Sequence, residues 1–276
     1  MNQNLDELIF LKLGGSLITD KHSQSTARIE RVHKLAVEIA EVQADSPNLK
    51  LLLGHGSGSF GHVAASIYST RQGVSTPQEW RGFAEVWHQA NLLNRIMIDA
   101  LHKAGLPAVT FSAASSAVVR DGILQTWNLD PMRKALAEGL LPVVHGDVAF
   151  DQTLGGTILS TEDIFQYLAH ALQPKRILLA GIEPGVWADY PACTRIIPEI
   201  TPTNQAEILP LVGASEATDV TGGMASKVRQ MLDLTADVPG LEVMIFSATK
   251  PGELKTTISS IDSSQPSSGT LIRQSI

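Results

Sequence analysis

Residues 54–62 (GHGSGSFGH) place four glycines directly after an apolar run, and this stretch constrains the fold most strongly. The run, residues 49–53, is typical of a strand buried in a parallel sheet. Residues 63–68 can form a helix. A strand that passes through glycines into a helix N-terminus exposes backbone N–H groups that no side chain shields. The stretch therefore predicts an anion site, most often one for phosphate, with His62 as a titratable donor at its far end.

Other interpretations of these glycines stay open. Gly56-x-Gly58-x-x-Gly61 also matches the dinucleotide-binding pattern. That pattern requires an acidic residue at the end of a second strand, about 20 residues later. Residues 75–80 (STPQEW) contain instead a helix start broken by proline, which places Glu79 poorly. A purely structural glycine turn is the third interpretation.

Composition narrows the class of protein. A chain of 276 residues with 43% hydrophobic and 18% charged residues is long enough for one large α/β domain or two modest lobes. The net charge of −7 and the lack of a basic patch argue against a nucleic-acid partner. No signal peptide and no apolar run of membrane-spanning length is visible. The single cysteine, Cys193, fits a reducing compartment, so we expect a cytoplasmic protein with no membrane partner.

Strand-like and helix-like segments alternate along the chain, which indicates an open, mainly parallel α/β sheet with its site along the carboxyl edge. Predicted strands cover residues 8–13, 49–53, 108–111, 141–144, 176–180, 241–246 and 270–272. Predicted helices cover residues 28–44, 77–104, 130–138 and 164–172. The serine-rich residues 259–268 predict an exposed loop.

Several polar residues stand at the predicted strand ends. Lys12 interrupts the first strand, and a buried lysine is costly unless its ammonium group reaches a partner. It precedes Gly14 and Gly15, so this is not the P-loop pattern. Lys21, taken alone, is typical of a solvated loop lysine. Asp147 follows another strand, where its carboxylate can bind a hydroxyl, a metal or a substrate, or cap the next turn.

The predicted helix over residues 77–104 carries an aromatic stripe, Trp80, Phe83 and Trp87. Such stripes are usually part of the core, and this interpretation stays open beside a contact with an apolar ligand. Glu162 and Asp163 fall at the start of another helix, where the helix dipole favours acids, so Glu162 taken alone indicates simple capping.

These motifs resemble those of the amino acid kinase family. The resemblance rests on KLGGS at residues 12–16, on residues 55–62, on HGD at residues 145–147, and on DVTGGM at residues 219–224 with Lys227. They occur in the family's order and spacing from residue 8 to about residue 272. The resemblance implies a three-layer αβα sandwich with a mainly parallel central sheet, in one domain that dimerises with a second copy. Residues of about 1–174 would bind the acceptor and those of about 175–276 would bind ATP.

The resemblance also implies individual roles. Lys12 and Lys227 would bind the transferring phosphoryl group, and Asp163 would hold both lysines in place. Lys21 would stabilise the transition state, while His62 would grip the acceptor phosphate. The expected catalytic residues are Lys12, Lys21, His62, Asp163 and Lys227. The expected substrate-binding residues are Ser57, His62, Gly146, Asp147 and Thr161. The expected ATP-binding residues are Lys12, Gly14, Gly15, Ser16, Gly58, Gly185, Asp189, Gly223 and Lys227.

The part of the resemblance that ends in Ser59-Phe60-Gly61-His62 is similar to members that phosphorylate a phosphate or a phosphonate. It implies direct in-line transfer from ATP, accompanied by Mg²⁺, to isopentenyl phosphate, with no dedicated metal ligands. A phosphate monoester with a second pKa near about 6 is already a nucleophile at neutral pH and needs no general base. A small phosphonate such as fosfomycin, or nucleotide binding without catalysis, is the alternative. The aromatic stripe favours an apolar tail, and the retained charged residues favour catalysis.

Three departures from the family's pattern stand out. Ser57 occupies the place of a usual glycine, and Ser160-Thr161-Glu162-Asp163 replaces a more usual Ser-Gly-Asp-Asp. Residues 181–186 (GIEPGV) replace Thr-Asp-Val-Asp-Gly-Val and lack two polar side chains. We therefore expect nucleotide recognition to be looser than usual, or to be built differently.

Overall fold

Eight of the described strands form a central sheet, in the order β12-β14-β13-β9-β1-β2-β6-β3. The computed structural model describes residues 8–21, 23–212, 223–260 and 269–275, the side chains of 62–64 excepted. Neighbouring strands run parallel, except that β13 and β14 are antiparallel. The strands are β1 (Leu8–Leu13), β2 (Lys50–His55), β3 (Ala108–Thr110), β6 (Leu141–His145), β9 (Arg176–Gly181), β12 (Glu199–Ile200), β13 (Glu242–Ser247) and β14 (Thr270–Ile272).

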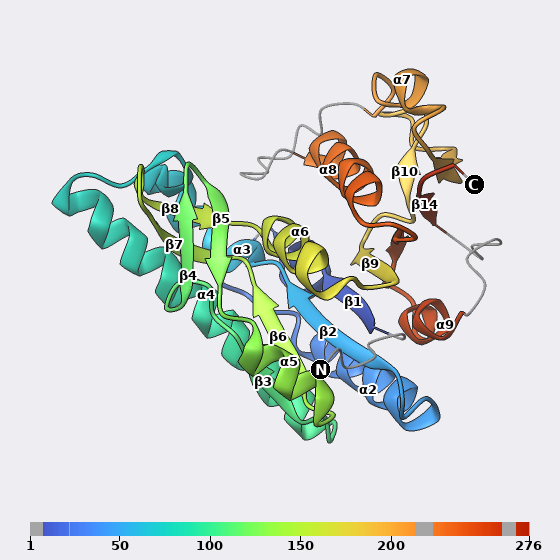
Figure 1. Ribbon diagram of the computed structural model, residues 1–276, viewed down its shortest axis with the longest axis horizontal. Coiled ribbons are helices and arrows are strands. Elements are labelled where there is room, and N and C mark those ends of the chain that lie inside the picture. The colour runs from blue at the N-terminus through green and yellow to red at the C-terminus, as the bar shows by residue number, and fades with distance from the viewer. Residues whose placement is uncertain (1–7, 22, 213–222, 261–268, 276) are drawn as a thin grey trace.

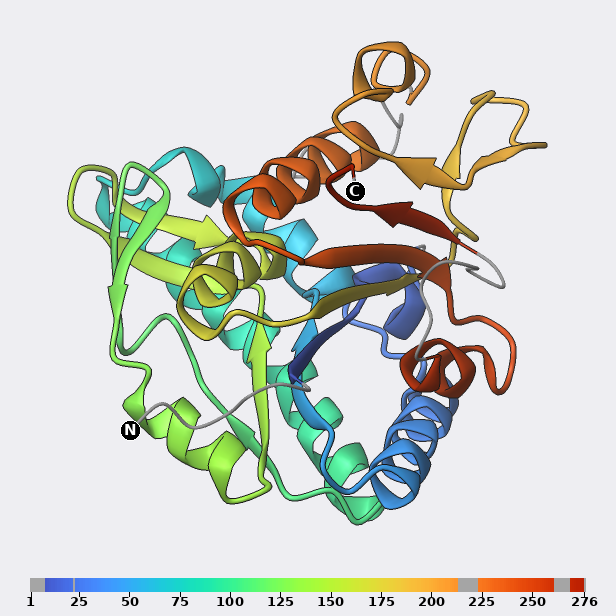
Figure 2. The same ribbon diagram turned by 45° about the vertical axis from the view of Figure 1, so that its right-hand side comes forward.

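Helices cover both faces of this sheet, as Figures 1 and 2 show. One face carries α1 (Gly15–Ile18), α2 (Ile29–Asp45), α4 (Pro77–Lys103) and α9 (Glu253–Ser259). The other face carries α5 (Asp130–Ala137), α6 (Thr161–Leu172) and α8 (Gly223–Asp237). The remaining described helices are α3 (Gly58–Tyr68), η1 (Thr70–Gln72) and α7 (Gln205–Ile208). The predicted three-layer αβα architecture with a mainly parallel sheet is confirmed.

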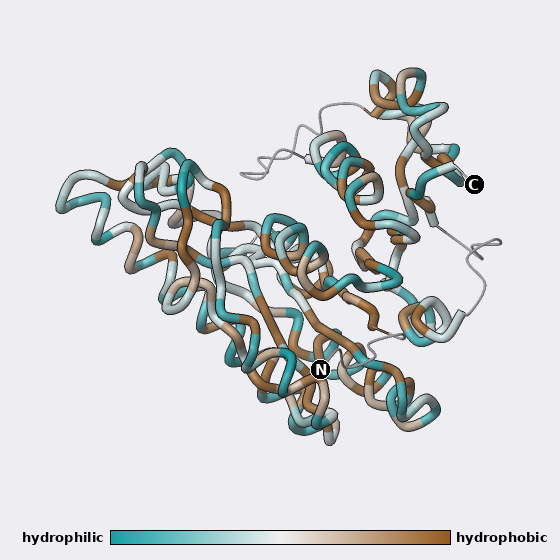
Figure 3. The backbone as a smooth tube through the Cα atoms, viewed as in Figure 1, coloured by the Kyte–Doolittle hydropathy of each residue, from teal (hydrophilic) through white to brown (hydrophobic). Residues whose placement is uncertain are grey.

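Alternating side chains of the central strands supply both halves of the core. In β1, Leu8 and Phe10 face α6, where the Phe10 ring lies 5.1 Å from that of Phe165, and Leu11 and Leu13 face the opposite helices. Both faces are covered, so an inner strand is apolar at nearly every position. Figure 3 shows this as hydrophobic strands at the centre and hydrophilic outer faces of the helices.

A second, four-stranded sheet lies beside α4 and was not predicted from the sequence (Figure 1). Its order is β5-β4-β7-β8, with β4 (Ala117–Arg120), β5 (Ile123–Trp127), β7 (Asp147–Asp151) and β8 (Gly155–Leu159). Asp151 stabilises its turns, because its carboxylate accepts hydrogen bonds from the amides of residues 121, 122, 153 and 154. A hairpin of β10 (Val186–Trp187) and β11 (Ile196–Ile197) completes the described strands.

Capping boxes set the starts of two helices. Thr76 and Glu79 cap α4, with Pro77 at its first position, and the predicted start at residue 77 agrees with the structure. Ser160 and Asp163 cap α6, so this helix begins at Thr161, three residues before its predicted start. The DVTG part of the 219–224 motif and residues 261–268 of the predicted serine-rich loop lie outside the described residues.

Candidate active site

Two glycine turns meet at the carboxyl ends of β1 and β2. Lys12 pairs with Gly54 in the parallel register of these strands, so the turns follow side by side. A Cβ added to Gly15 would lie 2.6 Å from the Cα atom of Gly58, a separation that only glycine permits. The close contact explains why both turns are rich in glycine, and the predicted proximity of the 54–62 stretch to Lys12 is confirmed.

Gly58 begins α3 in a conformation that requires glycine. Its φ is +50°, and a Cβ at this position would lie 2.2 Å from Oγ1 of Thr19. That hydroxyl accepts a hydrogen bond of 3.0 Å from the amide of Ser59 and donates to the Gly15 carbonyl. The N-terminus of α3 is thus fixed against the first glycine turn, with Ser57 at its N-cap position and His62 on its second turn. The side chain of His62 lies outside the described residues.

Glu162 joins the two predicted phosphoryl-binding lysines. Its Oε1 atom contacts Nζ of Lys12 and lies 3.6 Å from Nζ of Lys227. Burial raises the pKa of this carboxyl, but Lys12 and then Lys227 outweigh the effect and lower the pKa to about 2. Glu162 is therefore ionised at neutral pH, and a cation from β1 and a cation from α8 share one buried anion.

The expected role of Asp163 needs correction, because the lysines contact its neighbour instead. Oδ2 of Asp163 accepts hydrogen bonds from the amide of Ser160 (2.8 Å) and from Arg71 (3.2 Å). Oδ1 accepts one from Gln230 (3.2 Å). Since α6 begins at Thr161, the second helical residue, Glu162, points toward the lysines while the third turns back to cap the helix. Glu162 was interpreted from the sequence as a simple cap.

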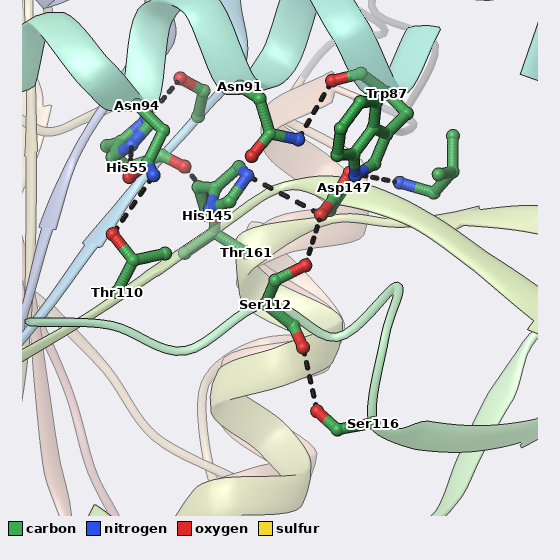
Figure 4. Close-up of polar contacts among 12 residues, drawn as sticks. His55, Trp87, Asn91, Asn94, Thr110, Ser112, Ser116, His145, Asp147 and Thr161 are labelled. Carbon is green, nitrogen blue, oxygen red and sulfur yellow. Dashed lines mark hydrogen bonds and ion pairs between the residues drawn. The ribbon is translucent and has the colours of Figure 1, made fainter. Parts of the chain in front are cut away.

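A buried polar network extends behind the glycine turn (Figure 4). His55 and His145 occupy paired positions on β2 and β6, and their rings stack with centroids 5.3 Å apart. Nε2 of His55 lies 3.2 Å from Oδ1 of Asn94. Nε2 of His145 lies 3.5 Å from Oδ2 of Asp147, which also accepts a hydrogen bond from Ser112. His55 was not predicted as a site residue from the sequence, and His145 was interpreted only as part of a motif.

His145 and Asp147 form a neutral pair between about pH 3 and about pH 7. Burial, followed by the neighbouring His55, lowers the pKa of His145 to about 3. Burial raises the pKa of Asp147 to about 7, although hydrogen bonds from Ser112 and from the Val148 amide oppose it. The separation of 3.5 Å and the unpartnered nitrogens of His145 agree with a neutral pair rather than an ion pair.

Substitutions in this pair are expected to change the pH dependence of stability in opposite directions. An aspartate with a raised pKa costs stability as the pH rises from about 4 to about 7. Asp147→Asn should therefore gain up to about 4 kcal/mol in unfolding free energy, relative to the wild type, across that range. A buried neutral histidine contributes stability as the pH rises from about 3 to 6.5. His145→Gln should lose stability, relative to the wild type, over that range.

Urea unfolding of the three proteins at pH 4, 5.5, 7 and 8 measures both slopes. If the pair is neutral, the unfolding free energy of Asp147→Asn minus that of the wild type should rise with pH. The same difference for His145→Gln should fall with pH. In an ion pair the aspartate pKa would be lowered and the histidine pKa raised, so the Asp147→Asn difference would stay flat above about pH 4 and the His145→Gln difference would rise above about pH 6.5.

Two other residues expected to bind the acceptor, Gly146 and Thr161, lie at the carboxyl end of β2. The Thr161 hydroxyl and the Gly146 amide both donate to the His55 carbonyl, over 2.7 Å and 3.1 Å. Thr161 and Asp147 are each 1% exposed, so their polar groups contact other groups of the protein and not solvent. Lys21 is exposed, on the turn between α1 and α2. The structure brings Gly146 and Thr161 together at the site and places Asp147 behind it.

The residues expected in the nucleotide half lie beyond β9. A Cβ on Gly185 would lie 2.7 Å from Oγ1 of Thr270, so glycine allows the hairpin to pack on β14. Asp189 accepts hydrogen bonds from the amides of Thr194 and Arg195 and organises that turn. Gly223 begins α8, the helix that carries Lys227. The altered 181–186 turn contributes Glu183, which accepts a hydrogen bond from the Trp187 indole at 2.8 Å.

Known proteins resemble this chain over nearly its whole length. The model of the amino acid kinase family matches residues 7–247. The chain belongs to this family. Isopentenyl phosphate kinase of Haloferax volcanii is 34% identical over 252 residues, covering 91% of this chain and 98% of that protein. The enzyme of that name from Methanothermobacter thermautotrophicus is 32% identical over 262 residues, covering 91% and 95%. A crystal structure of an isopentenyl phosphate kinase superposes with a TM-score of 0.78, at 28% identity, covering 96% of this chain and 100% of that one.

The carboxylates of this amino acid kinase site are already engaged by protein groups. Glu162 contacts two lysines, Asp163 caps α6, and Asp147 is buried against Ser112. Among the described residues there is no group of three or more His, Cys, Asp or Glu side chains that could hold a metal ion. A site of this kind fits Mg²⁺ that arrives with the phosphate oxygens of ATP, since Mg²⁺ keeps several waters and substrate oxygens as ligands.

Proposed function

We propose that this chain transfers the γ-phosphoryl group of ATP to isopentenyl phosphate and forms isopentenyl diphosphate. The observation that carries the proposal is the pair of lysines held by one buried glutamate beside two touching glycine turns. The choice of acceptor is supported by the relatives, which are named isopentenyl phosphate kinases.

The charges of the site suit a reaction between two anions. Phosphoryl transfer depends mainly on positioning and on stabilising the charge of the transition state. Lys12 and Lys227 would contact the transferring group, and Lys21 would reach it from the exposed turn. The amides that begin α3 would hold phosphate oxygens together with Ser57 and Gly58, and His62 would donate to the acceptor phosphate. Mg²⁺ bound to ATP would neutralise further charge. The acceptor needs no general base, because it is already ionised at neutral pH.

An aromatic cluster of three residues would receive the apolar tail of the acceptor. Trp80 and Phe83 on α4 meet Phe150 of β7, with ring centroids 5.0–5.9 Å apart. Phe83 is buried, whereas Phe150 is 57% exposed, so the cluster runs from the interior to the surface. Val148 packs beneath it. Burial of a five-carbon tail contributes up to about 3–4 kcal/mol, at about 0.8 kcal/mol per carbon.

Shortening Phe83 is expected to admit longer acceptors. Phe83→Leu and Phe83→Ala should raise the ratio of kcat/KM for a ten-carbon to a five-carbon prenyl phosphate by roughly ten-fold, because space for two or more carbons opens. Trp87, one turn further along α4 and 44% exposed, is the second position to truncate. Leu92→Ala, at a position 43% exposed on the same helix, is the matched control. An unchanged ratio in the folded Phe83 and Trp87 variants would make these aromatic residues core packing only.

Identification of the product tests the proposed reaction itself. Purified protein is incubated with ATP, Mg²⁺ and isopentenyl phosphate, and the mixture is followed by ³¹P NMR. We expect the monophosphate resonance to be replaced by the two coupled resonances of a diphosphate, with ADP formed in equal amount. ADP and inorganic phosphate without a new diphosphate would contradict transfer to this acceptor.

Assembly and location remain proposals as well. No helix in the part of the chain that the structure describes is long and apolar enough to cross a membrane. We propose that the protein acts in the cytoplasm as a homodimer.

A further inference from the structure

Arg71 connects η1, on the acceptor side, to α8, on the nucleotide side, through a single carboxylate. Its guanidinium donates to Oδ2 of Asp163 at 3.2 Å, and Gln230 of α8 donates to Oδ1 of the same carboxylate at 3.2 Å. The backbone carbonyl of Arg71 accepts a hydrogen bond from the Thr157 hydroxyl on β8. Arg71 is therefore tied at both ends to the unit formed by β8 and the first turn of α6.

The same turn of α6 holds the catalytic lysine of α8. Lys227 and Gln230 are three residues apart on α8, so they lie on one face of that helix. Glu162 and Asp163 are consecutive, and each contacts one of these two α8 residues. Gln230 also donates to Gln166, one turn further along α6, at 3.0 Å. Gln230 thus ties the face of α8 that carries Lys227 to the first two turns of α6.

Arg71 places a positive charge beside the carboxylate that Gln230 contacts. Asp163 and Glu162 are neighbouring carboxylates, and the two lysine ammonium groups face Glu162. The guanidinium of Arg71 and the amide of Ser160 occupy Oδ2 of Asp163. The lysines contact Glu162, and the charge of Asp163 is balanced by Arg71. The side chains of Arg71 and Asp163 are 33% and 23% exposed, so the pair is less screened than a surface ion pair.

We propose that Arg71 is a positioning residue, which acts through Asp163 and Gln230 to hold α8 and Lys227 in the geometry for phosphoryl transfer. The Arg71–Asp163–Gln230 contact, here called the clasp, does not touch the substrate in this account. Its effect belongs to the catalytic step rather than to substrate binding, because Lys227 contributes most to the transition state. The inference rests on the proposed function for its kinetic test, and a second readout is independent of it.

A double-mutant cycle measures how strongly Arg71 and Gln230 are coupled through the clasp. Arg71→Met and Gln230→Met should each lower kcat roughly ten-fold, since a small misplacement of a catalytic group is costly, with KM for ATP and acceptor changed less than about two-fold. The kcat of the double variant should be no lower than that of the more impaired single variant, because either substitution alone already breaks the clasp. Arg71→Lys should recover part of kcat, since it keeps the charge without the planar guanidinium. The proposal would be overturned if the fold losses in kcat of the two single variants multiplied in the double variant, or if kcat were normal in Arg71→Met.

A matched control separates the clasp from general stability. Arg273 donates to Glu199 at 2.6 Å, and its side chain is 22% exposed, in the β12–β14 region. Arg273→Met should lower the melting temperature about as much as Arg71→Met while leaving kcat unchanged. An equal loss of kcat in both variants would assign the effect of Arg71 to stability alone.

Hydrogen–deuterium exchange tests the clasp without any turnover. Amides of α8 should exchange faster in Arg71→Met and in Gln230→Met than in the wild type, while those of α9 should not change. Unchanged exchange in α8 would contradict the clasp even if the enzyme is active. Faster α8 exchange in the two variants, together with a wild type that fails to use isopentenyl phosphate, would contradict the proposed acceptor and leave the clasp standing.

Discussion

Replacement of Lys12 by alanine is expected to lower kcat by about two orders of magnitude. Loss of a charge-assisted contact that is strongest in the transition state costs roughly 3 kcal/mol, which corresponds to that factor in rate. Lys12 is 9% exposed, so water replaces its charge poorly. Lys227→Ala should behave in the same way, since both ammonium groups face Glu162.

Steady-state kinetics with ATP and isopentenyl phosphate measure this effect. Lys103→Ala is the control, because it removes an exposed lysine at the end of α4, far along the chain from the site. Near-normal kcat in both Lys12→Ala and Lys227→Ala would show that the lysines are structural.

Replacement of Glu162 by glutamine is expected to destabilise the protein by about 3 kcal/mol at neutral pH, because it removes the anion that two lysines share. The pKa of Glu162 falls from 4.5 to about 2 on folding. Its contribution is therefore complete above about pH 4.5 and is lost as the pH falls toward about 2. The stability difference between the two proteins should shrink over that range. We also expect a lower kcat, since the lysines lose their common partner.

Urea unfolding at pH 7 and at pH 3 tests this expectation. Glu138→Gln is the matched control, since Glu138 also pairs with a lysine, Lys134, but on an exposed helix surface. This control should unfold like the wild type at both values of pH. If Glu162→Gln were equally harmless at pH 7, the buried contact would not hold the lysines in place.

The inner strands of the fold could be predicted because burial on both faces leaves a clear apolar run. The predicted bounds of β1 and β14 agree with the structure, and those of β2 and β9 differ by one or two residues. The glycines that follow β1 and β2 marked the carboxyl edge correctly. Close contact between two backbones requires glycine whatever the surrounding sequence, so this signal is strong.

The second sheet could not be predicted because its strands are short and partly exposed. Val118, Ile123 and Phe150 project from β4, β5 and β7 with 38–64% of their surface exposed. Such strands carry neither a continuous apolar run nor a clean alternation. Asp147 begins β7 next to the end of β6, and its place after a strand led to the prediction of a substrate contact rather than of a buried carboxyl.

The location of the candidate site was predicted from the sequence, but only some of its contacts were. The lysine contact was assigned to Asp163 by resemblance to the family, and the structure places it on the neighbouring Glu162. The stacking of His55 on His145 depends on the pairing of β2 with β6, which a single sequence does not reveal. Arg71 reaches Asp163 from 92 residues away in the chain, and no local pattern predicts such a contact.

A comparison of acceptors tests the proposed reaction most directly. With ATP and Mg²⁺ held saturating, kcat/KM is measured for isopentenyl phosphate, methyl phosphate and fosfomycin. We predict that isopentenyl phosphate is the best acceptor, with a kcat/KM about two orders of magnitude above that of methyl phosphate, because four further carbons are buried at about 0.8 kcal/mol each. Equal use of methyl phosphate, or better use of fosfomycin, would contradict this prediction.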